Sequence, residues 1–187
     1  MIAHISINHF NVFFVAIVLF ASSCNNISKK EYSAHHFFDA SDYFNKTIKE
    51  LSNRKIKLEK TVILNDTEEK KVIDTIDWKN ELAIFINTNI NKSAIYEYYT
   101  TDSILQDSTL KIVYQSKNEK MHTKQFEVYF DKSNIVKKIN VLQTKNNLIF
   151  QSDTHFEYIP NTYYKIEKKQ SLLWFASDDI IINARFL

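Results

Sequence analysis

Four of the six histidines are the residues of this chain best suited to acid–base or metal chemistry. His35 and His36 are adjacent, with Asp39 close by, and imidazole and carboxylate groups are ligands for zinc. Adjacent side chains diverge on any regular element, and the chain has no HExxH motif, so we expect a solvated segment and no metal site here. His122 and His155 are isolated in strand-like segments. A hydrolase-like site built on either one would need a nucleophile brought to it by folding.

Tyrosines are the second group of candidates, and the chemistry they offer is binding. Tyrosine and tryptophan combine an apolar body with a polar tip, which suits a ligand groove or a protein interface. The candidates for contact with an apolar ligand or a protein partner are Tyr96, Tyr98, Tyr158, Tyr163 and Tyr164. The alternative is that the aromatic side chains fill the core, which we expect above all for Trp78 and Trp174.

Composition excludes several classes of function. Glycine is absent, which excludes dinucleotide and nucleotide phosphate loops, the GxSxG elbow and the standard calcium loop. The single cysteine excludes an intrachain disulfide and a cysteine-rich metal centre. Adjacent carboxylates at Asp178 and Asp179 bind a cation less often than they cap a turn, so we expect no cofactor. Asparagine is expected to replace glycine at turns, namely Asn65, Asn134 and Asn146–Asn147.

Charge argues against a nucleic-acid partner. The chain has 24 Lys and Arg against 22 Asp and Glu, a net charge of +2. Its lysine pairs are scattered along the sequence, whereas a nucleic-acid binder concentrates positive charge in a patch or stripe.

The first 23 residues have the pattern of a signal peptide. They contain no Asp, Glu, Lys or Arg, and residues 12–21 (VFFVAIVLFA) form an apolar run too short to span a bilayer as a helix. Small residues (ASS) end the run, and Cys24, the only cysteine, follows. This arrangement resembles the lipobox of bacterial lipoproteins, in which the signal is cut before the cysteine and the cysteine sulfur takes a diacylglycerol.

The lipobox resemblance implies that Cys24 is lipidated and that the membrane is a partner through this N-terminal anchor. Residues 25–33 are polar and aperiodic, so residues 24–33 are interpreted as the lipidated cysteine and a flexible tether. Asn25 in place of an aspartate implies placement at the outer membrane. Three alternatives stay open: cleavage by ordinary signal peptidase, giving a secreted protein with a free thiol; a cytoplasmic chain; and an uncleaved membrane tether.

Residues 34–187 are predicted to form a single α+β domain. Apolar residues at helical spacing predict short helices over residues 39–53 and from Asp77 to about Asn87. Elsewhere apolar residues alternate, which predicts strands over residues 57–64, 69–76, 94–101, 110–116, 123–131, 135–144, 148–159, 163–174 and 180–186. The short separators force antiparallel neighbours. We therefore expect a twisted antiparallel meander of about seven to nine strands with both helices packed on one face.

The order of these motifs resembles a group of uncharacterised lipoproteins from Bacteroidota. The matching segments are DWxxELxxF from Asp77, NINK from Asn89, FEVYFDKSNIVKKINV, LIFQS and YIPNTYYKIEKKQ. The resemblance implies location and shape rather than activity. In outline the meander also resembles the half-barrel of periplasmic lipoprotein carriers. We expect a lipid-anchored cell-envelope protein that binds an apolar ligand or an envelope protein; a purely structural component and a hydrolase-like enzyme are the alternatives.

Overall fold

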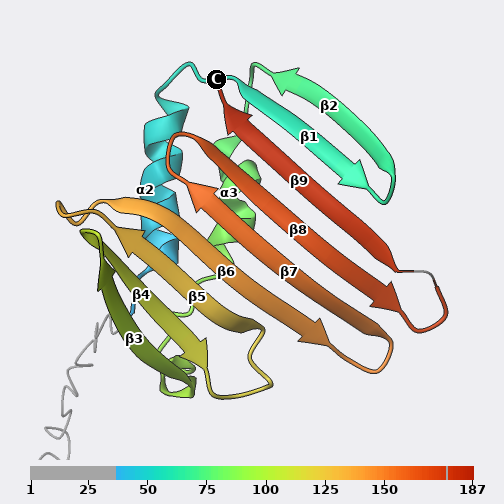
Figure 1. Cartoon of the computed structure of the whole chain (residues 1–187). Coiled ribbons are helices and arrows are strands. Elements are labelled where there is room, and N and C mark those ends of the chain that lie inside the picture. Colours follow the sequence, from blue (N-terminus) through green and yellow to red (C-terminus); the bar gives the residue numbers. More distant parts are fainter. Residues whose placement is uncertain (1–36, 176) are drawn as a thin grey trace, which may run out of the picture. The chain divides into compact units, whose positions relative to one another are not determined.

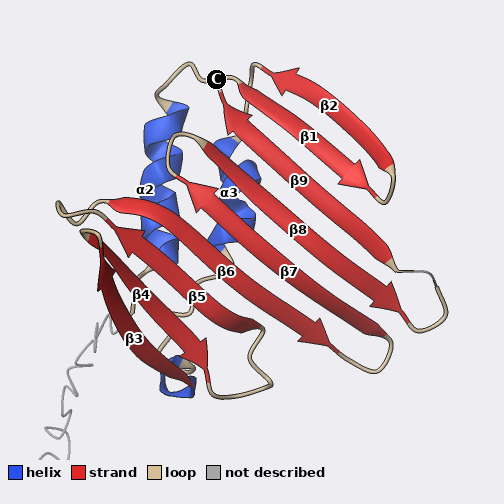
Figure 2. Cartoon of the chain, viewed as in Figure 1, coloured by secondary structure: helices blue, strands red, loops and turns tan. Residues whose placement is uncertain are grey.

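The computed structural model of the chain describes residues 37–175 and 177–187. The predicted signal peptide, Cys24, the tether and the His35–His36 pair lie outside these residues. Within them, nine strands form one antiparallel sheet that is not closed, and two α-helices pack on one of its faces (Figure 1; Figure 2). This arrangement confirms the predicted α+β fold class.

Both helices begin and end close to the predicted residues. Helix α2 spans Ala40–Ser52 and helix α3 spans Trp78–Ile86. The carboxylates of Asp39 and Asp77 each accept a hydrogen bond from a backbone amide three residues on, at 2.9 and 3.1 Å. These bonds satisfy amides that have no partner within the helix. The buried faces of the helices carry Ala40, Phe44 and Leu51 in α2, and Trp78, Leu82 and Phe85 in α3.

The strands follow the chain as an almost unbroken meander. They are β1 (Leu58–Leu64), β2 (Thr67–Ile73), β3 (Tyr99–Gln106), β4 (Thr109–Ser116), β5 (Thr123–Phe130), β6 (Val136–Asn146), β7 (Phe150–Ile159), β8 (Tyr163–Leu172) and β9 (Asp178–Phe186). Their order across the sheet is β2-β1-β9-β8-β7-β6-β5-β4-β3. The first hairpin therefore joins the sheet beside the last strand, with Leu58 opposite Phe186, and β2 and β3 are the edges.

Two predicted strands differ from the structure. The segment predicted as a strand over 94–101 contains a 3₁₀ turn at Tyr96–Tyr98 (η1), and β3 begins only at Tyr99. Every residue of β3 after Tyr99 is exposed, so the strand lacks the apolar alternation that marks a half-buried strand. The strand predicted over 163–174 ends at Leu172, because the chain turns there and Phe175 N donates to Leu172 O (3.0 Å).

Asparagine takes three of the five left-handed backbone positions among the described residues, and Asp107 and Ser108 take the other two. Asn65, Asn134 and Asn161 have φ of 53°, 61° and 56°. The prediction is confirmed at Asn65 and Asn134. In the Asn146–Asn147 turn the contribution is different: the side-chain oxygen of Asn147 accepts hydrogen bonds from two backbone amides of the turn.

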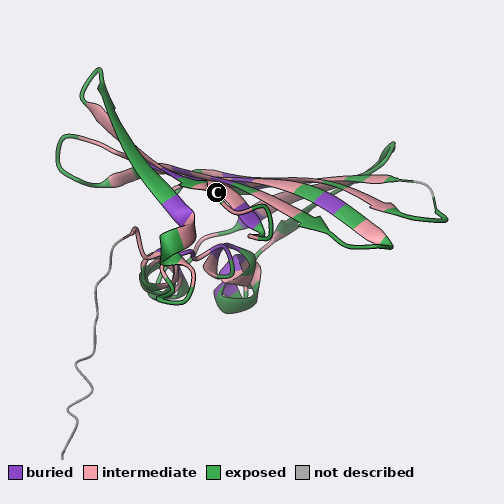
Figure 3. Ribbon diagram, turned by 90° about the horizontal axis from the view of Figure 1, so that it is seen from below, coloured by how far each residue is buried: buried purple, intermediate pink, exposed green. Residues whose placement is uncertain are grey.

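An aromatic cluster fills the space between the sheet and the helices. Phe44 of α2 stacks on Phe85 of α3 with ring centroids 5.1 Å apart, and the ring of Tyr158 lies 5.0 Å from Phe44 and 5.7 Å from Phe85. Seen edge-on, both helices lie on one side of the sheet, and the sheet extends beyond them (Figure 3). The opposite face has no described element over it; we call it the open face.

Candidate functional site

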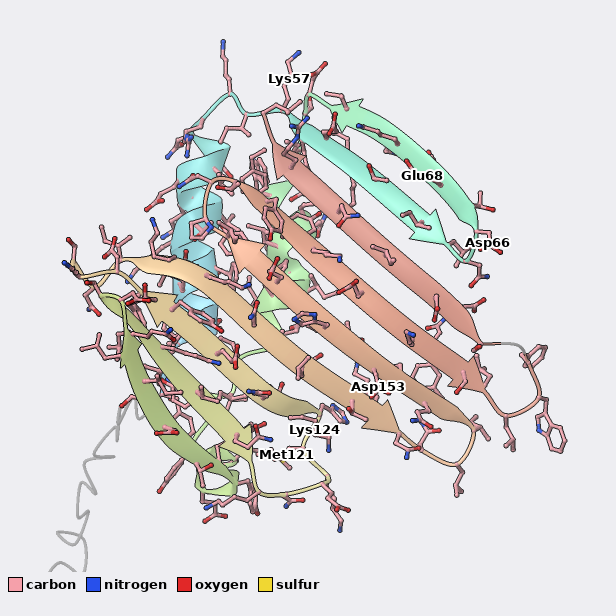
Figure 4. All side chains as sticks on the ribbon, in the orientation of Figure 1. Lys57, Asp66, Glu68, Met121, Lys124 and Asp153 are labelled. Atoms are coloured by element: carbon pink, nitrogen blue, oxygen red, sulfur yellow. The ribbon has the colours of Figure 1, made fainter. Side chains whose placement is uncertain are left out.

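A depression of about 490 Å³ lies on the open face, over β5 to β8. The side chains that shape it are Leu142, Thr144, Asp153, His155, Glu167 and Lys169. Leu142, His155 and Glu167 lie directly opposite one another on β6, β7 and β8. Their neighbours Val141 and Phe156 are buried toward the helices, so the period of two turns these three side chains to the other face. Figure 4 labels two of the residues around the depression, Lys124 near the start of β5 and Asp153 on β7.

The floor of the depression is apolar and its rim is charged. Leu142 is 42 % exposed, although the core on the other face is complete without it. His155 Nδ1 lies 3.4 Å from Glu167 Oε2, and Lys165 Nζ lies 2.8 Å from the other carboxylate oxygen. The hydrogen bond from Lys165 holds the pKa of Glu167 below its usual value. An apolar group can therefore sit on Leu142 with charged partners at its edge.

Carboxylates and lysines interleave over the rest of the open face. Lys111 Nζ lies 2.6 Å from Glu127, and the hydroxyl of Tyr129 donates to the same carboxylate at 2.8 Å. Burial would raise the pKa of Glu127, but the hydrogen bonds from Lys111, Tyr129 and Asn140 outweigh it and lower the pKa. This pair neutralises charge on the open face over β4 and β5.

A second carboxylate, Glu157, holds one of the predicted tyrosines on the open face. Glu157 pairs with Lys138 and accepts a hydrogen bond from the hydroxyl of Tyr163. That bond raises the pKa of Tyr163 to about 12. Burial would raise the pKa of Glu157, but the hydrogen bonds from Lys138 and Tyr163 lower it overall.

The five predicted tyrosines do not share one surface. Tyr158 and Tyr164 are a cross-strand pair, each 1 % exposed, within the core between sheet and helices. Tyr163 is half-buried on the open face, whereas Tyr96 and Tyr98 belong to η1, with Tyr98 packed against the core. The core interpretation therefore holds for Tyr158 and Tyr164, and no common tyrosine groove forms.

The two tryptophans differ, and one expectation about them is wrong. Trp78 is 4 % exposed and packs its ring 5.4 Å from that of Phe186, as expected of a core residue. Trp174 is 85 % exposed, because β8 ends before it and the helices do not reach that end of the sheet. A signal for this exists in the sequence: SLLWF breaks the period of two, and such an apolar run cannot alternate between a core and solvent.

Among the described residues, His155 and the acids Asp178 and Asp179 have structural partners. His155 pairs with Glu167, which would supply a base and the carboxylate that orients it, but among residues 37–175 and 177–187 no Ser or Thr hydroxyl is hydrogen-bonded to His155 or His122. Asp178 accepts hydrogen bonds from Asn65 (3.3 Å) and Gln170 (3.4 Å), a turn contact. No group of three or more metal-ligating side chains occurs in the described part of the chain.

Comparison of the chain with known proteins finds no matching family model, curated protein or solved structure. No helix among the described residues is both long and apolar enough to cross a membrane.

Proposed function

We propose that this chain is a lipid-anchored protein of the cell envelope, attached to the outer membrane through Cys24, and that its α+β domain is a binding module. The sequence supports the anchor, because the only cysteine follows directly on an apolar run and small residues. A relationship to the Bacteroidota lipoproteins is part of the same proposal.

The observation that carries the binding role is the depression around Leu142. The helices already cover the apolar face of the sheet, so a half-exposed leucine on the open face has no part in that core. A volume of about 490 Å³ lies within the range of sites that hold small molecules or a partner's apolar side chain. The rim offers His155, Glu167 and Lys169 to polar groups of the ligand. We therefore propose a ligand with an apolar segment and a polar group beside it.

Native mass spectrometry of the protein from its own cells tests this role. We expect a bound species with the wild-type protein and its loss with Leu142→Asp, which places a charge on the floor of the depression. Ile84→Asp is the matched control, because the exposed fraction of Ile84 (39 %) is similar to that of Leu142 but Ile84 lies on α3. Equal occupancy of Leu142→Asp and wild type, or equal loss in both variants, would refute this site.

A further inference from the structure

Five apolar side chains project from two neighbouring loops at the end of the sheet. Leu148 and Ile149, in the β6–β7 loop, are 94 % and 62 % exposed. Leu173, Trp174 and Phe175, after β8, are 61 %, 85 % and 74 % exposed. We call these five residues the apolar tip. A soluble domain usually exposes large apolar side chains singly, so a group of this size marks an interaction surface.

Backbone hydrogen bonds hold the two loops together. Phe150 and Leu172 are the last cross-strand pair of β7 and β8, and Leu173 N donates to Ile149 O at 3.0 Å just beyond it. Asn147 closes the β6–β7 turn, with its N donating to Phe150 O at 2.9 Å. Leu148 therefore stands at the apex of one tight turn, beside the turn that carries Trp174. The apolar tip is held in place by backbone hydrogen bonds and is not a frayed end of the strands.

The apolar tip lies at the end of the sheet that the helices do not cover. Figure 1 shows the β6–β7 and β8–β9 loops at the lower right, away from α2 and α3, and the edge-on view shows no described element beneath that end of the sheet (Figure 3). None of the tip residues packs against the core cluster. No described residue of the core covers these side chains, so they are available to an external apolar surface.

The shape and charge of the tip fit a phospholipid surface. The tip consists of two adjacent turns that project from the end of the sheet, and a fluid bilayer accepts such a projection, whereas a protein partner must supply a matching hollow. Lys168 and Lys169 on β8 lie behind the tip, with Lys168 Nζ 5.8 Å from the ring centroid of Phe150. On β9, Asp179 lies opposite Lys169, and Asp178 lies opposite Gln170. Lysine stems extend along apolar surface and place the ammonium groups at phosphate level. These lysine and aspartate side chains carry both signs of charge and are therefore complementary to zwitterionic headgroups, which also carry both signs.

We propose that the apolar tip inserts into the interfacial layer of a phospholipid bilayer, with Trp174 at headgroup depth and Leu148 and Phe175 deeper. Tryptophan favours this interface, and apolar burial drives such insertion. The inference rests on the proposed anchor, which would keep the membrane near the domain, since an extended segment of the length of residues 25–36 reaches about 43 Å at most. Insertion would orient the domain and fix the height of the open face above the membrane.

Trp174 is a built-in reporter for the test. The chain has two tryptophans, and Trp78 is buried, so the difference in emission between the wild type and Trp174→Phe isolates Trp174. With the full chain and phosphatidylcholine vesicles, we expect the Trp174 emission to shift to shorter wavelength, to lose its quenching by acrylamide and to be quenched by bromine-labelled acyl chains. Unchanged emission and quenching of Trp174 in the presence of bound vesicles would overturn the inference while leaving the anchor intact.

Two further variants distinguish insertion of the apolar tip from nonspecific adsorption to vesicles. In the Cys24→Ala background, Leu148→Ser is expected to weaken vesicle binding about tenfold, because burial of a leucine side chain contributes at least that factor. Leu105→Ser is the matched control: Leu105 is 74 % exposed but lies on the edge strand β3. Equal weakening of vesicle binding by the two variants would count against insertion of the apolar tip. A shift in Trp174 emission that grows with protein concentration without lipid would assign the tip to self-association instead and overturn the inference.

Discussion

Lys60 on β1 and Glu81 on α3 form an ion pair across the boundary between sheet and helices, with Nζ 2.7 Å from Oε1. The hydroxyl of Tyr164 on β8 donates a hydrogen bond to the same oxygen. Burial raises the pKa of Tyr164, and the hydrogen bond to the Glu81 carboxylate raises it further. One carboxylate thus joins α3 to two strands that are far apart in the sequence.

Glu81→Ala is expected to lower the free energy of unfolding by about 2 kcal/mol, because it leaves an ammonium and a hydroxyl without their partner in a largely buried place. Urea unfolding at neutral pH measures this. The control is Lys46→Ala, which removes an ion pair to Asp42 with side chains 70 % and 59 % exposed, and is expected to cost clearly less, because solvent screens an exposed pair. Equal costs for the two variants would show that burial gives the Glu81 contacts no advantage.

The helices and most strands could be predicted because their signals are local. Asp39 and Asp77 mark the helix starts as N-caps, and alternation marks the strands from β4 onward. The pairing of β1 with β9 could not be predicted in this way. Leu58 and Phe186 lie at opposite ends of the domain sequence, and no local pattern says which edge of a meander an early hairpin joins.

The candidate site was less predictable, for a related reason. Period two places Tyr158 and Tyr164 on one face, but the sequence does not say which face the helices cover, so a core pair and a groove give the same pattern. Leu142 looks like any other apolar strand residue. Its significance comes from the packing of α2 and α3 on the opposite face, which is a tertiary property.

Asn134 provides a test of how this chain folds without glycine. Its φ is 61°, where a side chain other than that of Asn, Asp or Gly is crowded by the backbone. Asn134→Ala is therefore expected to lower the free energy of unfolding by about 1 kcal/mol, while Asn134→Gly is tolerated. Thermal or urea unfolding of both variants, with Ser133→Ala in the same turn as the control, measures the difference. A cost for Asn134→Gly as large as that for Asn134→Ala would point to the side chain rather than to the backbone.

Glu127 is expected to make stability depend on acid pH. Its pKa is lowered in the folded protein, because hydrogen bonds from Lys111, Tyr129 and Asn140 outweigh burial. A carboxyl of this kind stabilises the fold fully above its unfolded pKa, and this contribution is lost as the pH falls through the folded pKa. We expect the free energy of unfolding to decrease on acidification below about pH 4.5.

The Glu127→Gln variant isolates this effect. It is expected to be less stable than the wild type at pH 7, and to lose less stability between about pH 5 and pH 3, because the titrating group is gone. Urea midpoints at several pH values measure the slope. Glu68→Gln is the control, since Glu68, labelled in Figure 4, is exposed on the edge strand β2. Its carboxylate has no hydrogen bond or ion pair with any described residue. If the stability of Glu127→Gln falls with decreasing pH as steeply as that of the wild type, the acid sensitivity belongs to other carboxyl groups.

Cys24→Ala tests the attachment of the protein to its membrane. Without the thiol, no diacylglycerol can be added, and no helix of the described residues is long and apolar enough to hold the chain in a bilayer. We expect most of the variant to move from the membrane fraction to the soluble fraction, because insertion of the apolar tip alone is reversible, and intact-mass spectrometry to find acyl chains on the wild type only. Ser23→Ala keeps a small residue before the cysteine and should leave fractionation and mass addition unchanged. A variant that stays in the membrane fraction and retains residues 1–23 would identify an uncleaved tether. A wild type that is soluble, cleaved and free of acyl mass would identify a secreted protein with a free thiol.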